Sequence, residues 1–188
     1  MRRLLLMVSV LVIGAGLYVA SPFRAAWALR EAIKTGDTRT IERKIEWKSV
    51  RESLRKSLAH NPRLLPEVNK VGAEIRPTMW QRVKWAFGSS MLDRFLETYV
   101  TPEGMHKLYK YRMTWNSHVK GLPPDDSLPL PERLKKFYSR ILRAEFLSPT
   151  RFEIEIVDKD TPTRAYVGLF ELDWTEWKLT SLKIANKV

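Results

Sequence analysis

The sequence predicts an α+β protein in which an N-terminal transmembrane helix precedes several helices that pack on a C-terminal antiparallel meander of three or four strands. Three observations lead to this prediction: an apolar run at residues 4–23, helical spacing of apolar residues as far as Arg143, and alternation of apolar and polar residues after Ala144. We therefore expect a membrane anchor or uncleaved signal at residues 1–23. One α+β ectodomain should fill residues 24–188, helical over 24–143 and stranded over 144–188.

The apolar segment from Leu4 to Phe23 has no charged side chain and follows two arginines. Because hydrocarbon about 30 Å thick needs roughly 20 helical residues, this segment is long enough to span a bilayer. A cleaved signal peptide is the alternative, with Ala20 as the residue before the cut. Tyr18 would then stand at the third position back, where a small side chain is needed, so an uncleaved anchor is favoured.

Turn signals divide the helical section. A helix is expected over residues 25–34, after which Gly36 supplies a left-handed stop and Asp37 caps a second helix that carries Ile41 and Ile45. Thr101 and Pro102 suit the cap and the first position of a later helix. The helices expected after the second one cover residues 48–60, 79–87, 89–100, 103–111 and 131–143, with a proline-rich loop at 121–131.

The last section has the two-residue period of strands. A short strand is expected at residues 144–147, and Phe152, Ile154 and Ile156 then alternate with glutamates. Two further strands are expected where Tyr166, Phe170 and Leu172 share a face, and where Trp177, Leu179 and residues 182–184 follow. Residues 158–163 and 173–176 are predicted to be turns.

Composition excludes several classes of protein. Disulfides, thiolate metal sites and cysteine nucleophiles are ruled out because the chain has no cysteine. The formal net charge is +12, and it is concentrated in the helical section: residues 24–86 hold 15 basic and 7 acidic side chains, whereas residues 144–188 hold 6 and 8. The basic excess therefore lies next to the apolar segment in sequence.

Seven basic side chains fall on two neighbouring predicted helices and are candidates for contact with anionic lipid: Arg39, Arg43, Lys44, Lys48, Arg51, Arg55 and Lys56. Each basic residue near an anionic membrane surface contributes about 1 kcal/mol. A solvated helix face is the plainer alternative. Nucleic acid could also bind such a cluster, but it is absent from the surroundings of an exported domain, so it is not expected as a partner.

Seven aromatic and histidine side chains, six of them in the second half of the chain, are candidates for lining a pocket, although ordinary core packing is the commoner role. They are Trp47, His106, Tyr109, Tyr111, Trp115, Tyr166 and Phe170. The three histidines have no acidic partner at metal-ligand spacing, and no cofactor is expected. Ser53 and Ser117 each begin a Ser-x-x-Lys match, but the other motifs of penicillin-binding enzymes are missing, so a serine nucleophile is not supported.

Several short segments resemble an uncharacterised bacterial family, domain of unknown function 2939. They are residues 28–33 with Gly36-Asp37, residues 50–54, residues 100–104 and residues 177–180, in this order and spacing. The resemblance implies an N-terminal apolar segment and no established activity. Glu46-Trp47 departs from the family's tendency to Asp and an aromatic residue. The order of elements is more distantly similar to cone-shaped folds of the nuclear-transport-factor-2 type, which host both enzymes and binding proteins.

Together these observations predict a membrane-tethered module without enzymatic activity that binds a partner protein, a lipid or a small ligand close to the bilayer. We expect a single-pass protein of the bacterial inner membrane with its C-terminal domain in the periplasm. The expected partners are the membrane itself, and anionic lipid or an envelope protein. An enzyme that uses a cone-fold pocket without a cofactor is the alternative, and a cytoplasm-facing nucleic-acid binder is a third hypothesis.

Overall fold

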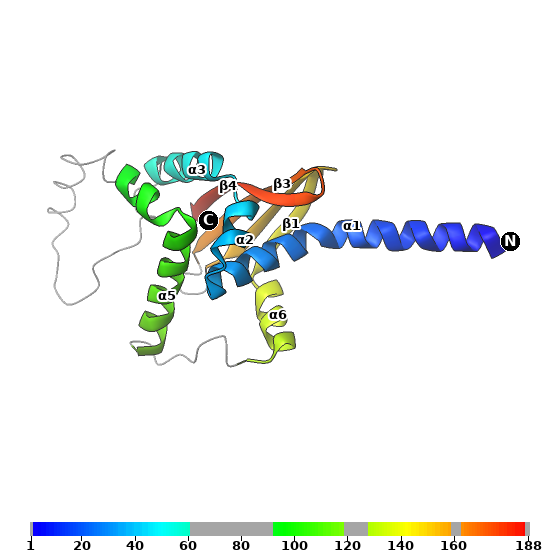
Figure 1. Ribbon diagram of the computed structural model, residues 1–188, viewed down its shortest axis with the longest axis horizontal. Helices are drawn as coiled ribbons and strands as arrows, with labels where there is room; N and C mark the ends of the chain where they lie inside the picture. The colour runs from blue at the N-terminus through cyan, green and yellow to red at the C-terminus, as the bar shows by residue number, and fades with distance from the viewer. Residues whose placement is uncertain (1, 61–91, 119–127, 159–162, 187–188) are drawn as a thin grey trace.

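The computed structural model describes residues 2–60, 92–118, 128–158 and 163–186. Within these ranges the protein has a long N-terminal helix, a group of shorter helices and a C-terminal four-stranded sheet, as Figure 1 shows. The α+β class is therefore confirmed. The helix predicted at residues 79–87 and most of the two loops predicted at 121–131 and 158–163 lie outside the described residues.

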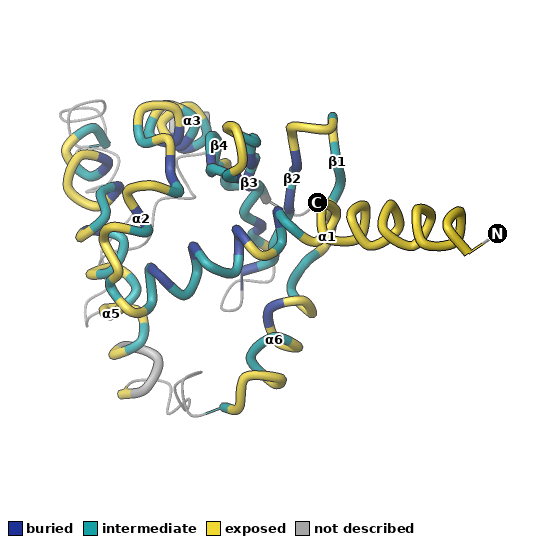
Figure 2. Tube along the Cα trace, turned by 45° about the vertical axis from the view of Figure 1, so that its right-hand side comes forward, coloured by how far each residue is buried: buried dark blue, intermediate teal, exposed yellow. Residues whose placement is uncertain are grey.

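The first helix, α1 (Arg2–Thr35), joins the apolar segment to the domain without a break. Its residues up to Ala20 are exposed, whereas Pro22, Ala25, Ala26, Leu29 and Ala32 are buried, as the colours of Figure 2 show. Among the described residues, α1 is the one helix that is long and apolar enough to cross a membrane. Its length and composition fit a membrane anchor or a signal sequence, and its second half belongs to the domain core.

A proline lies where the exposed part of α1 meets the domain. Pro22 has no N–H group, so it cannot bond to the carbonyl of Tyr18 as an ordinary helical residue would. The hydroxyl of Ser21 donates to that carbonyl instead (2.6 Å), and it accepts a hydrogen bond from the indole Nε1 of Trp177 (2.7 Å). The Ser21 hydroxyl therefore replaces the backbone donor that the Tyr18 carbonyl lacks, and it also connects the helix to the sheet.

The helices after α1 are α2 (Thr38–Lys44), α3 (Trp47–His60), a helix over residues 92–99, α5 (Pro102–His118) and α6 (Leu130–Tyr138). The predicted stop and cap are confirmed: Gly36 has φ 78, and the Asp37 side chain accepts from the Thr40 amide. Thr101 Oγ1 accepts from the Gly104 amide (3.0 Å), so it caps α5 as predicted. The helix then continues to His118, well beyond the predicted end at Tyr111.

The strands β1 (Ile141–Ser148), β2 (Arg151–Val157), β3 (Arg164–Asp173) and β4 (Glu176–Asn186) form one antiparallel meander in the order β1-β2-β3-β4. The predicted boundary between helix and strand was wrong by one turn of helix. Residues 141–143 belong to β1 rather than to a helix, because Ile141 pairs with Ile156 and the Arg140 carbonyl accepts from the Val157 amide (2.9 Å). Pairing with β2 outweighs the helical spacing of these residues.

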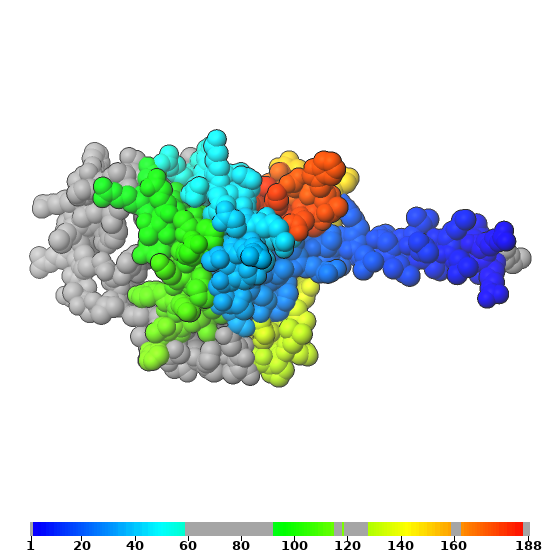
Figure 3. Space-filling view, viewed as in Figure 1, coloured from blue at the N-terminus to red at the C-terminus, as the bar shows by residue number. Residues whose placement is uncertain are grey.

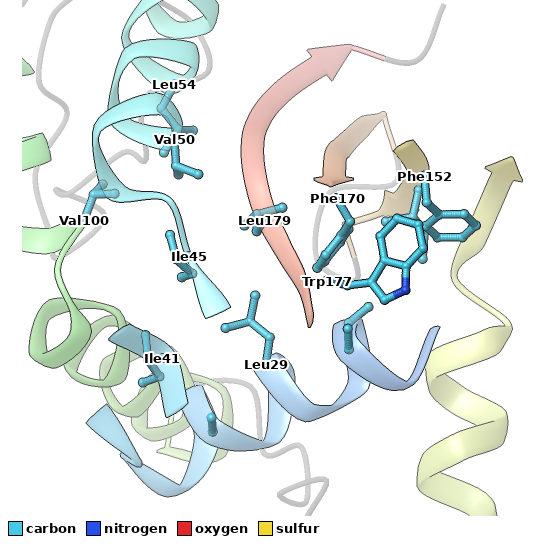
Figure 4. Close-up of a cluster of buried hydrophobic side chains, with 14 of the residues drawn as sticks. Leu29, Ile41, Ile45, Val50, Leu54, Val100, Phe152, Phe170, Trp177 and Leu179 are labelled. Carbon is cyan, nitrogen blue, oxygen red and sulfur yellow. The ribbon is translucent and has the colours of Figure 1, made fainter. Parts of the chain in front are cut away.

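A bulge in β4 explains the uneven spacing of its apolar residues. Leu169 pairs with Ser181 but Phe170 pairs with Leu179, so Thr180 is an extra residue on β4. The extra residue shifts the alternation by one, which returns Leu182 and Ile184 to the face that holds Trp177 and Leu179. That face meets the helices in a single core, shown in Figure 4, with Phe152 and Ile41 fully buried. The opposite face carries ion pairs of Arg143 with Glu153 and Glu155.

Helix α3 covers the edge of the sheet that β4 forms. The hydroxyl of Ser53 contacts the amide and carbonyl of Leu182, and that of Ser57 contacts those of Ile184, at 2.8–3.2 Å. Four helical residues rise about 6 Å and two strand residues about 6.7 Å, so both hydroxyls reach alternate residues of β4. This contact protects an edge that could otherwise pair with another chain. It also gives Ser53 a structural role in place of the nucleophile that its Ser-x-x-Lys match suggests.

We expect that replacing Ser53 and Ser57 together by alanine destabilises the protein by about 1 kcal/mol per hydroxyl, because the edge groups of β4 lose their partners. Amide hydrogen exchange should become faster at Leu182 and Ile184. Ser49→Ala, at an exposed position of the same helix, is the matched control and should change neither quantity. Unchanged exchange in the double variant would contradict the proposed edge protection.

Candidate ligand-binding pocket

A cavity of about 440 Å³ lies between the helical layer and the sheet. Helix α1 forms one wall, α5 and α6 form others, and β2, β3 and β4 form the floor. Its volume is within the range of small-molecule sites in proteins. The apolar side chains that line it are Ala26, Leu29, Ile33, Met105, Met113, Phe137, Ile154, Ile156, Phe170, Leu179 and Leu182.

A glycine on β3 contributes to the space above the floor. Gly168 lines the cavity, and a Cβ atom placed on it would lie 3.3 Å from Leu179 Cδ1 and 3.6 Å from Phe170 Cε2. A side chain there would therefore be crowded by its neighbours and would reduce the cavity. The absence of a side chain at Gly168 therefore keeps this part of the cavity open.

The charged groups that line this cavity among the described residues are three arginines, Arg30, Arg112 and Arg140. Arg30 also pairs with Glu31 (2.6 Å) and lies over the ring of Trp27, with its Cζ 5.0 Å from the ring centroid. A lining of this kind combines a large apolar surface with positive charge at a few points. It suits an apolar molecule or an amphipathic molecule with an acidic group.

A hydrogen-bonded carboxylate lies beside the cavity. Asp158 is 7% exposed and accepts from the phenol of Tyr166 (2.6 Å) and from a guanidinium N–H of Arg112 (3.1 Å). Burial, and then the hydrogen bond and charge of Asp158, raise the pKa of Tyr166 to about 12. The phenol therefore keeps its proton at neutral pH, which suits a donor to Asp158 and not a catalytic base.

We expect Tyr166→Phe to destabilise the fold by about 1–3 kcal/mol at pH 7, because a buried Asp158 oxygen loses its donor. The folded protein holds the phenolic proton more tightly than the unfolded chain, whose tyrosine pKa is 10.0. This contribution is complete below pH 10 and is lost as the pH rises towards 12. Urea denaturation should show a shallower decline over that window for the variant than for the wild type.

Tyr111→Phe is the control for this substitution, because Tyr111 is 62% exposed on α5. It should leave both the stability at pH 7 and the alkaline decline unchanged. Equal effects of the two substitutions would show that the contact between Tyr166 and Asp158 contributes nothing to stability.

Comparison with known proteins identifies the family. The model of a family described as a protein of unknown function (DUF2939) matches residues 11–108, which is more than half of the chain. The chain belongs to the DUF2939 family. No curated protein and no solved structure matches it. The matched part of this DUF2939 protein includes most of α1, whereas the sheet that forms the pocket floor lies beyond it.

The structure brings three of the predicted pocket residues together in the DUF2939 protein: Tyr109, Tyr166 and Phe170 all line the cavity. His106 lies nearby but contacts the end of α1, where its Nδ1 is 2.8 Å from the Ile33 carbonyl and its ring covers Gly36. Trp47, the first residue of α3, packs against the core, and Tyr111 points to solvent. The side chain of Trp115 lies outside the described residues.

The prediction omitted most of the pocket wall, in particular Ala26, Leu29 and Ile33 of α1 and Met105 and Met113 of α5. Ala26, Leu29 and Ile33 are three and four residues apart, and Met105 and Met113 are eight apart, so each set marks one face of a helix. A core face and a pocket face have the same spacing. Sequence alone therefore gave no signal that separates the two.

The seven basic candidates lie on α2, which packs against α1, and on α3, which packs against β4 (Figure 1). Four of them pair with carboxylates of the protein: Arg43 and Lys44 with Glu176, Arg55 with Asp93, and Lys56 with Glu52. The axis of α1 from Tyr18 to Thr35 extends about 25 Å, so α2 begins far from the point where the exposed helix enters the domain. The end of α2 lies closer to that point, because Arg43 and Lys44 pair with Glu176 in the β3–β4 hairpin. Lipid contact by these residues stays a prediction.

Proposed function

We propose that this DUF2939 protein is a periplasmic module tethered to the bacterial inner membrane by α1, and that it binds an apolar or amphipathic small molecule in the cavity. The observation that carries the proposal is the apolar cavity itself, whose wall is built from the helix that continues into the exposed apolar segment. One wall of the binding site and the tether are therefore two halves of the same helix.

The distance between the site and the tether supports a ligand that comes from the bilayer. Ala26 is the first pocket residue of α1, and it follows Ala20, the last residue of the exposed run, by about 9 Å of helix. An acyl chain would leave lipid and enter an apolar cavity at little cost in hydration. Arg30 and Arg112 already pair with Glu31 and Asp158, but a guanidinium has five N–H donors, so these two side chains and Arg140 can also donate to an acidic head group on that molecule.

A bound acidic amphiphile should be detectable in the purified protein. We expect mass spectrometry of an organic extract of the detergent-purified full chain to show a fatty acid or acidic lipid, and the chain to bind added radiolabelled palmitate. Met113→Trp should reduce both signals at least several-fold, because the larger side chain fills the cavity. Leu108→Trp is the matched control on the same helix, since Leu108 is partly exposed and does not line the cavity. Equal binding by both variants would contradict a site in this cavity.

The orientation is testable separately. A reporter that is active only outside the cytoplasm, fused after Val188, should be active in cells, because the two arginines before the apolar run favour a cytoplasmic N-terminus. The same fusion to a reporter that works only in the cytoplasm should be inactive. Activity of the cytoplasmic reporter would contradict the periplasmic placement and leave the cavity proposal to be judged by ligand binding.

A further inference from the structure

The end of the sheet next to the exposed part of α1 carries exposed apolar side chains. Trp174 is 95% exposed in the two-residue turn between β3 and β4, and Leu147 is 48% exposed just before the turn between β1 and β2. The order of the meander places both turns at one end of the sheet, where the Leu172 amide donates to the Thr150 carbonyl (2.8 Å). The ends of both hairpins lie on the side of the domain from which the N-terminal half of α1 emerges (Figures 1 and 3).

Direct contacts fix this end of the sheet against α1. The Tyr18 hydroxyl donates to the Pro149 carbonyl, and the Tyr18 ring lies 5.7 Å from the ring of Phe146 and 6.4 Å from that of Trp177. The bond between Trp177 and Ser21 adds a second connection on the same side of the helix. Along the axis of α1, the two turns therefore lie beside residues 18–21.

The length of the apolar segment relates this level to the bilayer. The exposed run of residues 4–20 extends about 26 Å, which is less than the hydrocarbon thickness of about 30 Å. The uncharged run reaches that thickness only when it is counted to Phe23, which already contacts the sheet through Phe152, with ring centroids 4.9 Å apart. A bilayer matched to the whole run therefore extends to the level of both turns.

Trp174 has two properties that fold stability does not explain. Its φ of 56° lies in the region that favours glycine, and its side chain makes almost no contact with the protein. Tryptophan is enriched where membrane proteins cross the interface between hydrocarbon and water. The nearby carboxylates are paired, Asp173 with Lys178 (2.6 Å) and Glu176 with Arg43 and Lys44, so the turn can approach anionic head groups.

We propose that the turns at residues 147–150 and 173–176 insert into the head-group layer of the bilayer that α1 crosses, with Trp174 as the principal contact. The partner of this surface is the lipid interface. The contact would hold the domain upright on its anchor with the cavity at a fixed distance from lipid. The inference rests on the proposed anchor, because it requires α1 to span the membrane.

Site-directed spin labelling tests this arrangement in the full chain, which has no native cysteine. Single cysteines at Thr175→Cys in the turn, Lys183→Cys further along β4 and Val12→Cys in the anchor would be labelled in vesicles of phosphatidylethanolamine and phosphatidylglycerol. We expect the label at position 175 to collide with water-soluble nickel complexes several-fold less than the label at 183, and more than the label at 12. Equal accessibility at 175 and 183 with a protected position 12 would overturn this inference alone. An accessible position 12 would overturn the anchor.

Trp174→Gly in the Thr175→Cys background separates membrane contact from folding. Glycine adopts the backbone conformation of this turn without strain, so the melting temperature should stay the same or rise. The label at position 175 should nevertheless become several-fold more accessible to nickel, because the indole no longer holds the turn in the interface. Unchanged accessibility would overturn the role assigned to Trp174.

Discussion

The contact between the second half of α1 and the sheet is the constraint on which the rest of this DUF2939 structure depends. Ala25, Ala26, Leu29 and Ala32 of this half are buried, and Ala26 and Leu29 face the strands across the cavity. The same helix continues without interruption through the exposed apolar segment. Because an α-helix is stiff over this length, the orientation of the core and that of the apolar segment are coupled.

The cavity arises from the way the other helices attach to α1. Helix α6 is held by the edge-to-face contact between the rings of Trp27 and Phe137, with centroids 5.4 Å apart, and by the pair of Glu31 and Arg133. Burial raises the pKa of Glu31, but the hydrogen bond from Arg133 and the charges of Lys34, Arg133 and Arg30 outweigh it and lower the pKa. Helix α5 attaches further along, where His106 meets the Ile33 carbonyl. Between these attachments the helices leave the floor around Gly168 uncovered.

Local signals in the sequence predicted the ends and the buried faces of helices correctly where the geometry of a stop, a cap or an apolar face requires a particular kind of residue. Gly36 stops α1, Asp37 and Thr101 provide caps, and the spacing of Val50, Leu54 and Leu58 identifies the buried face of α3. Local signals failed at residues 141–143, where the helical pattern continues but pairing with β2 decides the conformation. The prediction that Trp47 and Tyr111 line the pocket with Tyr166 is not matched by the cavity, because aromatic composition does not determine which way a side chain faces.

The sequence by itself determined the α+β class, the apolar segment, the caps and stops of the helices and the apolar faces of the strands, because each of these depends on residues close together in the chain. The tertiary structure alone decided three other features: the continuity of the apolar segment with the core helix, the bulge that returns Leu182 and Ile184 to the core, and the cavity between α1, α5, α6 and the sheet. These features depend on contacts between segments that are far apart in sequence. The local spacing of apolar residues does not predict how closely such segments approach each other or where a cavity remains between them.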